Sequence, residues 1–293
     1  LTLALLAARM IVEGRLSEES DVLVVTVQNS AVANITQQIR RILYSQRLPP
    51  VGYHVCTLHK LANDILRQRH DLAGVEESYP IVDEAESQRT MRGAAEVWIA
   101  SRRAWWESLL PEASESQRAK MIEAWRSETE RVGREVVKLC KHLQLTPAEA
   151  QQLLPNLKPE SGQGDEFLDM GIGLYALYER YLQARSGLDF DDLIWRALGA
   201  LDQDATFLAN LRARWPIILE DEARDSSPLQ ERILEKLCGE RGNWVRVGDP
   251  NQSINSTFTA ADPRYFRRFA ERADVQALSL PQSGRCARPI IQL

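Results

Sequence analysis

Carboxylates come directly after a short apolar run in the last third of the chain. Ile217-Ile218-Leu219 is followed by Glu220, Asp221 and Glu222. The run predicts a buried strand, and ligands of parallel sheets bind beyond the carboxyl ends of strands. There, one carboxylate can hold Mg²⁺ while its neighbour activates a water, which are the two roles that hydrolysis of a nucleoside triphosphate needs. Alternatively, these acids merely cap a following helix near Ser226.

A polar turn follows the strand expected at residues 244–247. Gly248-Asp249-Pro250-Asn251-Gln252 begins with a glycine, which permits a tight turn. The amide of Gln252 offers both a donor and an acceptor, as sensing of a γ-phosphate and its attacking water requires. Taken alone, the same string is also typical of an ordinary turn.

The elements that carry these residues alternate between strand and helix. Residues 22–26, V-L-V-V-T, form an apolar run without alternation, which predicts a strand buried on both faces. The pattern continues with a helix over residues 30–45, a strand at 54–57 and a helix near 61–68. This order is typical of an α/β fold with a parallel sheet.

Strand patterns disappear between residues 76 and 186, where the sequence is charged and has helical periodicity. We expect an all-helical insertion there, with a loop over residues 155–165, where Pro and Gly gather. Rings at helical spacing are expected in its core rather than on a binding surface: Trp98, Trp105, Trp106 and Trp125. The predicted organisation is a first part of the α/β domain at 1–75, the helical insertion at 76–186 and a second part at 187–293.

Composition restricts the class of protein. The net charge of -5 gives no whole-chain reason to expect nucleic-acid binding, so any DNA groove must be local. Arg264, Arg267 and Arg268 are interpreted as a solvated face. The apolar start at residues 1–8 is too short to span a bilayer and lacks the basic start of a signal peptide, so no membrane contact is expected. The four cysteines lack C-x-x-C spacing, which predicts reduced thiols in a cytoplasmic protein.

In their order along the chain, the motifs resemble those of the UvrD/Rep/PcrA branch of superfamily 1 DNA helicases. Residues 24–31 look like T-x-T-N-K-A-A, 57–62 like T-F-H-S-x-A, and 187–193 like L-D-F-D-D-L-L. Residues 221–230 resemble a Walker B motif D-E-x-Q-D, 248–254 resemble G-D-x-x-Q-S-I, and 280–286 resemble L-x-x-N-Y-R-S. The resemblance implies a RecA-like parallel sheet flanked by helices, with an inserted all-helical subdomain.

The resemblance also implies residue roles. The cofactors would be ATP and Mg²⁺, with Asp221 on the metal, Glu222 as the catalytic base, Gln252 as the γ-phosphate sensor and Arg285 as the arginine finger. Single-stranded DNA would contact the motif residues Asn29, Thr57, His59 and Phe258. Outside this context, Thr57 is interpreted as a helix cap and His59 as a histidine satisfied at a helix start.

The chain departs from the family pattern at several positions. Arg224 stands where the family has Gln, Leu58 where it has Phe, and Asn255 where it has Tyr, while Thr259 appears where an Arg is usual. Phe258 is the remaining base-stacking candidate in that motif, so DNA binding is expected to rely more on backbone contacts.

The family's G-x-G-K-T loop does not occur in the 293 residues and would lie just before Leu1. We expect this chain alone to hydrolyse ATP poorly, because that loop cradles the phosphates. The intact parent is expected to couple ATP hydrolysis to 3′ to 5′ translocation on single-stranded DNA and to unwinding of duplex DNA. The alternatives are a non-catalytic module that binds DNA or a partner, and a helicase-nuclease parent whose nuclease lies beyond residue 293.

Overall fold

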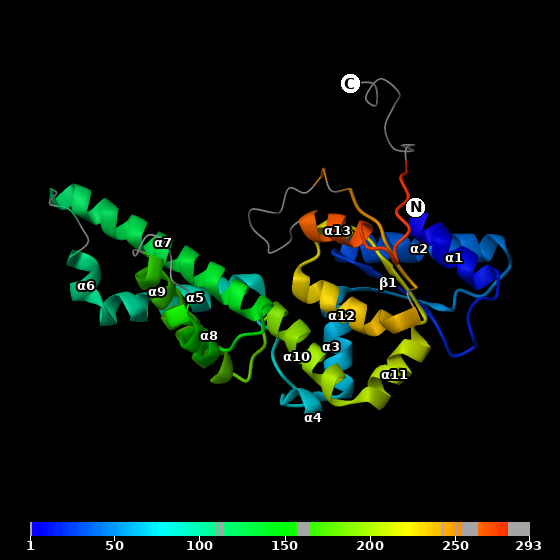
Figure 1. Ribbon diagram of the computed structural model, residues 1–293, viewed down its shortest axis with the longest axis horizontal. Helices are drawn as coiled ribbons and strands as arrows, with labels where there is room; N and C mark the ends of the chain where they lie inside the picture. Colours follow the sequence, from blue (N-terminus) through cyan, green and yellow to red (C-terminus); the bar gives the residue numbers. More distant parts are fainter. Residues whose placement is uncertain are drawn as a thin grey trace, which may run out of the picture.

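The computed structural model describes residues 2–108, 111, 114–156, 164–241, 243–249, 251–252 and 263–280. Within these residues, four strands form one sheet in the order β2-β1-β3-β4, and every neighbouring pair is parallel. The strands are β1 (Val22–Thr26), β2 (Tyr53–Thr57), β3 (Ile217–Glu220) and β4 (Trp244–Arg246). The two halves of the sheet therefore come from chain segments that the helical insertion separates (Figure 1).

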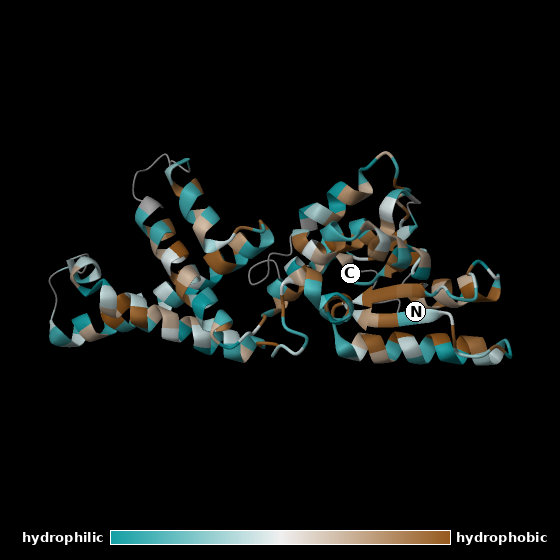
Figure 2. Cartoon of the chain, turned by 90° about the horizontal axis from the view of Figure 1, so that it is seen from below, coloured by the Kyte–Doolittle hydropathy of each residue, from teal (hydrophilic) through white to brown (hydrophobic). Residues whose placement is uncertain are grey.

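Helices cover both faces of the sheet, and β1 shows why its sequence is apolar without alternation. Val22 and Val24 pack into one core cluster, with α1 and α2, whereas Leu23 and Val25 pack into a second cluster on the other face. Apolar strands consequently lie between apolar helix faces (Figure 2). The helices are α1 (Thr2–Val12) and α2 (Asn29–Ser45) on the first face, and α3 (Leu58–Gln68), α10 (Phe190–Gln203) and α12 (Pro228–Cys238) on the second.

The helical insertion has a core of its own, separate from the two clusters of the sheet. Trp98 and Trp106 are buried in this core and Trp105 packs edge-on against Trp98, with ring centroids 5.6 Å apart. Trp125 packs against the same cluster, so the prediction that these four tryptophans belong to the core is confirmed. The helices are α5 (Glu84–Ser101), α6 (Arg103–Ser108), α7 (Glu115–His142), α8 (Pro147–Leu153) and α9 (Gly164–Gln183).

The predicted fold class, a parallel α/β sheet flanked by helices with an inserted helical part, is confirmed. The loop predicted over residues 155–165 is wrong at its end, because Gly164 and Asp165 already begin α9. Residues 155 and 156 belong to a 3₁₀ turn, and residues 157–163 of the predicted loop lie outside the described residues. Asp165 and Glu166 are residue types that the first turn of a helix favours. The remaining helices are α4 (His70–Ala73), α11 (Ala205–Arg214), α13 (Pro263–Ala270) and the 3₁₀ turns η1 (Leu154–Asn156), η2 (Ala223–Asp225) and η3 (Gly239–Arg241).

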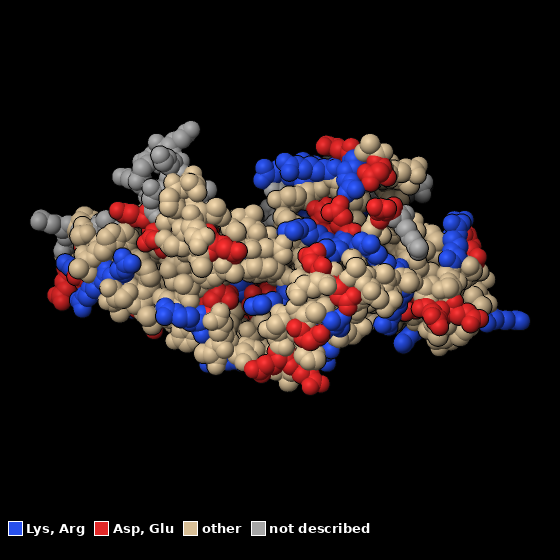
Figure 3. Space-filling view, turned by 60° about the horizontal axis from the view of Figure 1, so that its bottom comes forward, with Lys and Arg blue, Asp and Glu red and all other residues tan. Residues whose placement is uncertain are grey.

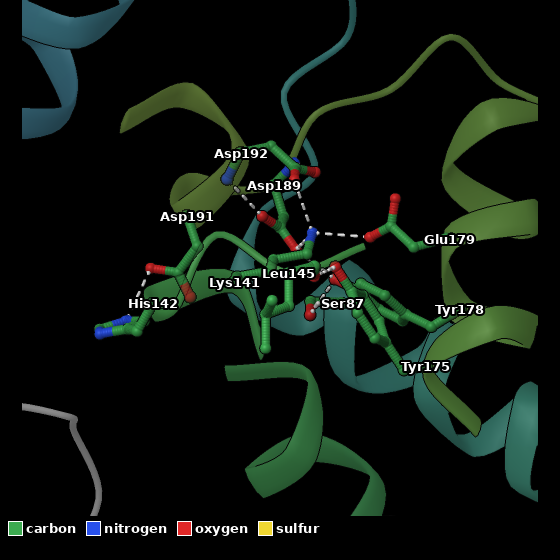
Figure 4. Close-up of polar contacts among 10 residues, drawn as sticks. All are labelled: Ser87, Lys141, His142, Leu145, Tyr175, Tyr178, Glu179, Asp189, Asp191 and Asp192. Carbon is green, nitrogen blue, oxygen red and sulfur yellow. Dashed lines mark hydrogen bonds and ion pairs between the residues drawn. The ribbon is translucent and has the colours of Figure 1, made fainter. Parts of the chain in front are cut away.

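A buried charge cluster joins the helical insertion to the sheet part. Lys141, near the end of α7, has a side chain with 0% exposure, and its Nζ lies 2.7 Å from Asp189, 2.8 Å from Asp192 and 2.9 Å from Glu179. Asp189 caps α10 by accepting from the Asp192 amide, and Tyr178 donates to Asp189 (Figure 4). One cation thus ties α7 and α9 of the insertion to the first turn of α10.

The surface carries both signs of charge. On the face shown in Figure 3, Lys and Arg are interspersed with Asp and Glu over the helical insertion and the sheet part alike. This mixture agrees with the expectation that any DNA groove is local rather than a property of the whole chain. Among the described helices, none combines the length and the apolar character needed to cross a bilayer.

Candidate active site

The carboxyl ends of β1, β3 and β4 meet at one edge of the sheet. The Asp221 amide donates to the Val25 carbonyl at 2.8 Å, and the Ala223 amide donates to the Val247 carbonyl at 2.9 Å. The loop after β3 is therefore held between the ends of its two neighbouring strands. The Thr26 hydroxyl, at the end of β1, lies 3.4 Å from the Asp221 carboxylate. Two oxygen groups from adjacent strands thus meet at this edge.

Glu222 has an unusual backbone conformation for a residue with a side chain. Its φ is 54° and its ψ is 37°, in the left-handed region, which costs an L-residue roughly 1 kcal/mol. Strained conformations of this kind gather at functional sites. The conformation leaves the Glu222 side chain 44% exposed, and its carboxylate forms an ion pair with Arg224. The proposed base is therefore accessible and has a cationic neighbour.

Arg224, at the position where the resemblance expects Gln, lies between two carboxylates. Besides Glu222, its Nε lies 3.7 Å from Asp225, and its side chain is only 14% exposed. The substitution thus places a positive charge beside the candidate base. An ion pair of a partly exposed side chain contributes about 0–1 kcal/mol, so it can bias the position of the Glu222 carboxylate without locking it.

The turn after β4 is organised by Asp249. Its carboxylate accepts from the Asn251 amide at 3.0 Å and from the Gln252 side-chain amide at 2.8 Å. Gly248 brings this turn against the loop after β3, because a Cβ built on it would lie 3.1 Å from the Arg224 amide nitrogen. The structure therefore brings the segments of Asp221, Glu222 and Gln252 together at neighbouring strand ends, with the Gln252 amide held by Asp249.

Glu220 and Arg246 form a buried ion pair beside these loops. Glu220 is one of the acids that the sequence places after the strand, but its pairing with Arg246 was not predicted. They are register partners at the ends of β3 and β4, with exposures of 2% and 1%, and Arg246 Nε lies 2.8 Å from Glu220 Oε2. Burial raises the pKa of Glu220, and the charge of Arg246 opposes that rise. The sequence feature that could have indicated this pair is a charged residue in each of two otherwise apolar strands, Glu220 in I-I-L-E and Arg246 in W-V-R.

Three of the four candidate DNA contacts, Asn29, Thr57 and His59, lie at the same edge, toward β2. Asn29 is the exposed first residue of α2, which follows β1, and Thr57 ends β2 in register with Thr26. The Thr57 hydroxyl accepts from the Lys60 amide at 3.3 Å, so Thr57 does cap α3. Capping uses one lone pair of that hydroxyl and leaves its donor available.

His59 lies in the first turn of α3 and packs on Phe190, the first residue of α10, with ring centroids 4.9 Å apart. Burial lowers the pKa of His59, and the nearby charges of Asp191 and Asp189 oppose that change. The histidine motif is thereby in contact with the segment by which the chain returns from the insertion.

Two predicted site residues, Phe258 and Arg285, lie outside the described residues. Arg267 and Arg268, interpreted as a solvated face, are exposed on α13.

Comparisons with known proteins agree with this arrangement. The model of the UvrD/REP helicase N-terminal domain family matches residues 1–274. The ATP-dependent DNA helicase UvrD2 of Mycobacterium tuberculosis is 35% identical over 125 residues, which cover 40% of this chain and 18% of the relative. The ATP-dependent DNA helicase Rep of Salmonella typhimurium is 22% identical over 272 residues, 92% of this chain and 35% of the relative.

The RecBCD enzyme subunit RecB of Mycolicibacterium smegmatis is 30% identical over 145 residues, 49% of this chain and 13% of the relative. The chain thus spans about a third or less of the length of these relatives. Because the family model covers most of the chain, which has the α/β fold and the ordered motifs expected of it, the protein belongs to the UvrD/REP helicase N-terminal domain family.

Proposed function

We propose that this chain is the first motor domain of an ATP-dependent DNA helicase that translocates 3′ to 5′ on single-stranded DNA and unwinds duplex DNA. The observation that carries the proposal is the meeting of Asp221 and Glu222 with the Gln252 turn at adjacent strand ends. In the proposed organisation, residues 1–75 and 187–293 form the motor core and residues 76–186 form the helical subdomain.

The oxygen groups at the sheet edge suit Mg²⁺, which prefers hard oxygen ligands. Asp221 would hold the ion, and the Thr26 hydroxyl, 3.4 Å from that carboxylate, is placed to orient it. The metal would supply charge neutralisation of the phosphates. Glu222 would orient and deprotonate the attacking water, and Gln252 would sense the γ-phosphate. By resemblance, Arg285 would offset charge that develops on the phosphoryl group.

DNA would lie across the β2 side of the same edge. Asn29, Thr57 and His59 are proposed contacts from the starts of α2 and α3, and Phe258 is the stacking candidate by resemblance. The proposed DNA contacts follow β1 and β2, and β1 also pairs with β3, the strand that leads into the loop of Asp221 and Glu222. DNA binding would therefore influence ATP turnover through β1.

The first test is on the gene. A G-x-G-K-T sequence encoded immediately before Leu1 supports the helicase proposal, whereas an unrelated sequence there favours the binding module. The observation in favour of that second candidate is the cation that Arg224 places on Glu222. In either case the 293-residue chain alone is expected to hydrolyse ATP poorly, because its sequence lacks the G-x-G-K-T motif whose lysine contacts the phosphates.

The second test is on the protein that contains the loop. Glu222→Gln should abolish DNA-stimulated phosphate release and leave ATP binding within about twofold, because the change removes the base and keeps the shape. Glu18→Gln, the same change at an exposed residue, serves as the control. Normal turnover in Glu222→Gln would show that the base is assigned to the wrong residue.

A further inference from the structure

Arg246, the last residue of β4, contacts four other elements around the loop that carries Asp221 and Glu222: β3, α12, η2 and α13. Its Nε lies 2.8 Å from Glu220 at the end of β3, and its Nη1 donates to Glu231 of α12 at 2.6 Å. Its Nη2 lies 3.5 Å from the Ala223 carbonyl in η2. The Nε–H does not point along the line to Glu220, so that contact is an ion pair rather than a linear hydrogen bond.

The guanidinium of Arg246 also packs on aromatic rings. Its central carbon lies 4.7 Å from the centroids of both Trp244 and Phe269, and 5.8 Å from that of Phe266. Phe266 and Phe269 belong to α13, which is the next described helix after the Gln252 turn. The Arg246 guanidinium is therefore in contact with the loop after β3, through Ala223, and with α13, through Phe266 and Phe269.

Glu220 also holds the two ends of the loop after β3 together. The Ser226 hydroxyl donates to its Oε1, so the first and last residues of the segment 220–226 meet on one carboxylate. Asp221 and Glu222 lie inside this closed segment. The left-handed backbone of Glu222 is strained, and such a conformation persists only where contacts on both sides of it hold the chain in place. A change in the direction of the Glu220 side chain would consequently move both proposed hydrolytic carboxylates.

Stability alone does not account for the pair. Replacing a buried ion pair by well-packed apolar residues of similar volume is often neutral or stabilising, because both charges lose their hydration on folding. Direction is fixed by the hydrogen bonds that flank the pair, from the Ser226 hydroxyl to Glu220 and from Arg246 to Glu231, because hydrogen bonds to charged groups have a defined geometry. The position of this pair, one residue before Asp221, makes direction the property that matters.

We propose that Glu220 and Arg246 are positioning residues that hold the loop of Asp221 and Glu222 in its hydrolytic conformation and join it to α13. The inference rests on the proposed ATP hydrolysis for its kinetic consequence, but its structural part applies to this chain by itself. Neither residue touches the nucleotide in this proposal, so nucleotide binding and turnover should respond differently when the pair is replaced.

The kinetic test uses the loop-containing protein with the paired substitution Glu220→Leu and Arg246→Met. We expect kcat to fall about 10- to 100-fold, as a small displacement of catalytic groups causes, while KM for ATP stays within about twofold. The single substitution Arg246→Lys, with Glu220 retained, keeps the positive charge and should give a kcat between those of the paired variant and the wild type. Ile218→Val, which removes one methyl group from the core of the same strand, is the control and should leave kcat unchanged.

The structural test uses the 293-residue chain and hydrogen exchange of residues 221–226. The paired variant should exchange these amides at least tenfold faster than the wild type, and by a larger factor than its change in free energy of unfolding accounts for. Ile218→Val should show no such excess. A paired variant with unaltered exchange and unaltered kcat would overturn the proposal. A wild-type protein without ATPase activity, whose paired variant still shows faster exchange, would contradict the proposed function and retain the positioning role.

Discussion

Lys141 and Asp189, 48 residues apart in the sequence, form a buried ion pair in which Nζ lies 2.7 Å from Oδ2. Burial lowers the pKa of Lys141, but the charges of Asp189, Asp192 and Glu179 together raise it well above its ordinary value. The lysine is therefore charged in the folded protein. Because Asp189 also caps α10, this one pair fixes the insertion against the helix that leads back to the sheet (Figure 4).

Lys141→Met should reduce the free energy of unfolding by about 3–5 kcal/mol, because it leaves two buried carboxylates, Asp189 and Asp192, and the partly buried Glu179 without their cation. The matched control is Lys120→Met, the same change at an exposed position of the same helix, which should shift it by no more than about 0.5 kcal/mol. Urea denaturation of both variants measures the difference. Equal effects of the two substitutions would show that the charge cluster does not stabilise the junction.

Asp192 makes the stability of this junction depend on pH. Burial first, and the charge of Asp189 second, raise its pKa from 3.8 to about 7, against the opposing charge of Lys141. Glu179, from α9, raises it further. Since the folded state holds the proton more tightly than the unfolded state, the contribution of this group is fully present below pH 3.8 and is lost as the pH rises through 7.

Asp192→Asn should therefore gain stability relative to the wild type as the pH rises from 5 to 8, because the amide resembles the protonated acid and does not titrate. Urea denaturation at each pH gives the difference between the two proteins. The difference, rather than either curve alone, isolates Asp192 from other titrating groups. A difference that stays constant between pH 5 and 8 would mean that Asp192 is already ionised in the folded protein.

Arg224→Gln should raise kcat of the loop-containing protein by up to about fivefold. That factor corresponds to the ~1 kcal/mol that an ion pair with a half-exposed partner can contribute, here by stabilising the charged Glu222 carboxylate and so weakening it as a base. Arg232→Gln, at an exposed position of α12, controls for the loss of one positive charge. Steady-state ATPase assays compare the two, and a lower kcat in Arg224→Gln would assign Arg224 a supporting role.

Local patterns predicted the sheet well. The apolar run of residues 22–26 coincides with β1, because burial on both faces leaves a strand no polar position. The acids that follow β3, Asp221 and Glu222, were also foreseeable, since charged residues after an apolar run mark the point where the chain leaves the core. The roles assigned to Asp221, Glu222 and Gln252 remain predictions, as do those of Phe258 and Arg285, which lie outside the described residues.

Partners across the fold were not predictable in the same way. Lys141 reads as an ordinary basic residue in the last turn of a helix, and Arg246 as an interruption of a strand. Each owes its burial to residues that other elements bring to it, Asp189 from α10 in one case and Glu231 from α12 in the other. One sequence carries no periodicity that encodes such pairings, so they follow only from the packed structure.

Gly248→Ala should separate the two loops of the proposed site. The added Cβ would lie 3.1 Å from the Arg224 amide nitrogen and 3.4 Å from that of Ala223, and backbone atoms cannot turn aside as a side-chain end can. The hydrogen bond from the Ala223 amide to the Val247 carbonyl, 2.9 Å long, should lengthen as the loops part. We expect the free energy of unfolding to fall by about 1–3 kcal/mol, and kcat of the loop-containing protein to fall about tenfold or more.

The control for this change is Gly199→Ala, in the middle of α10. A Cβ on Gly199 would meet no atom within 4 Å, and alanine favours a helix interior over glycine, so this variant should be more stable by up to about 1 kcal/mol. Denaturation midpoints and ATPase rates of the pair thus separate a steric clash from the general effect of replacing glycine. If Gly248→Ala matched Gly199→Ala in both measurements, the close approach of the two loops would not matter for the site.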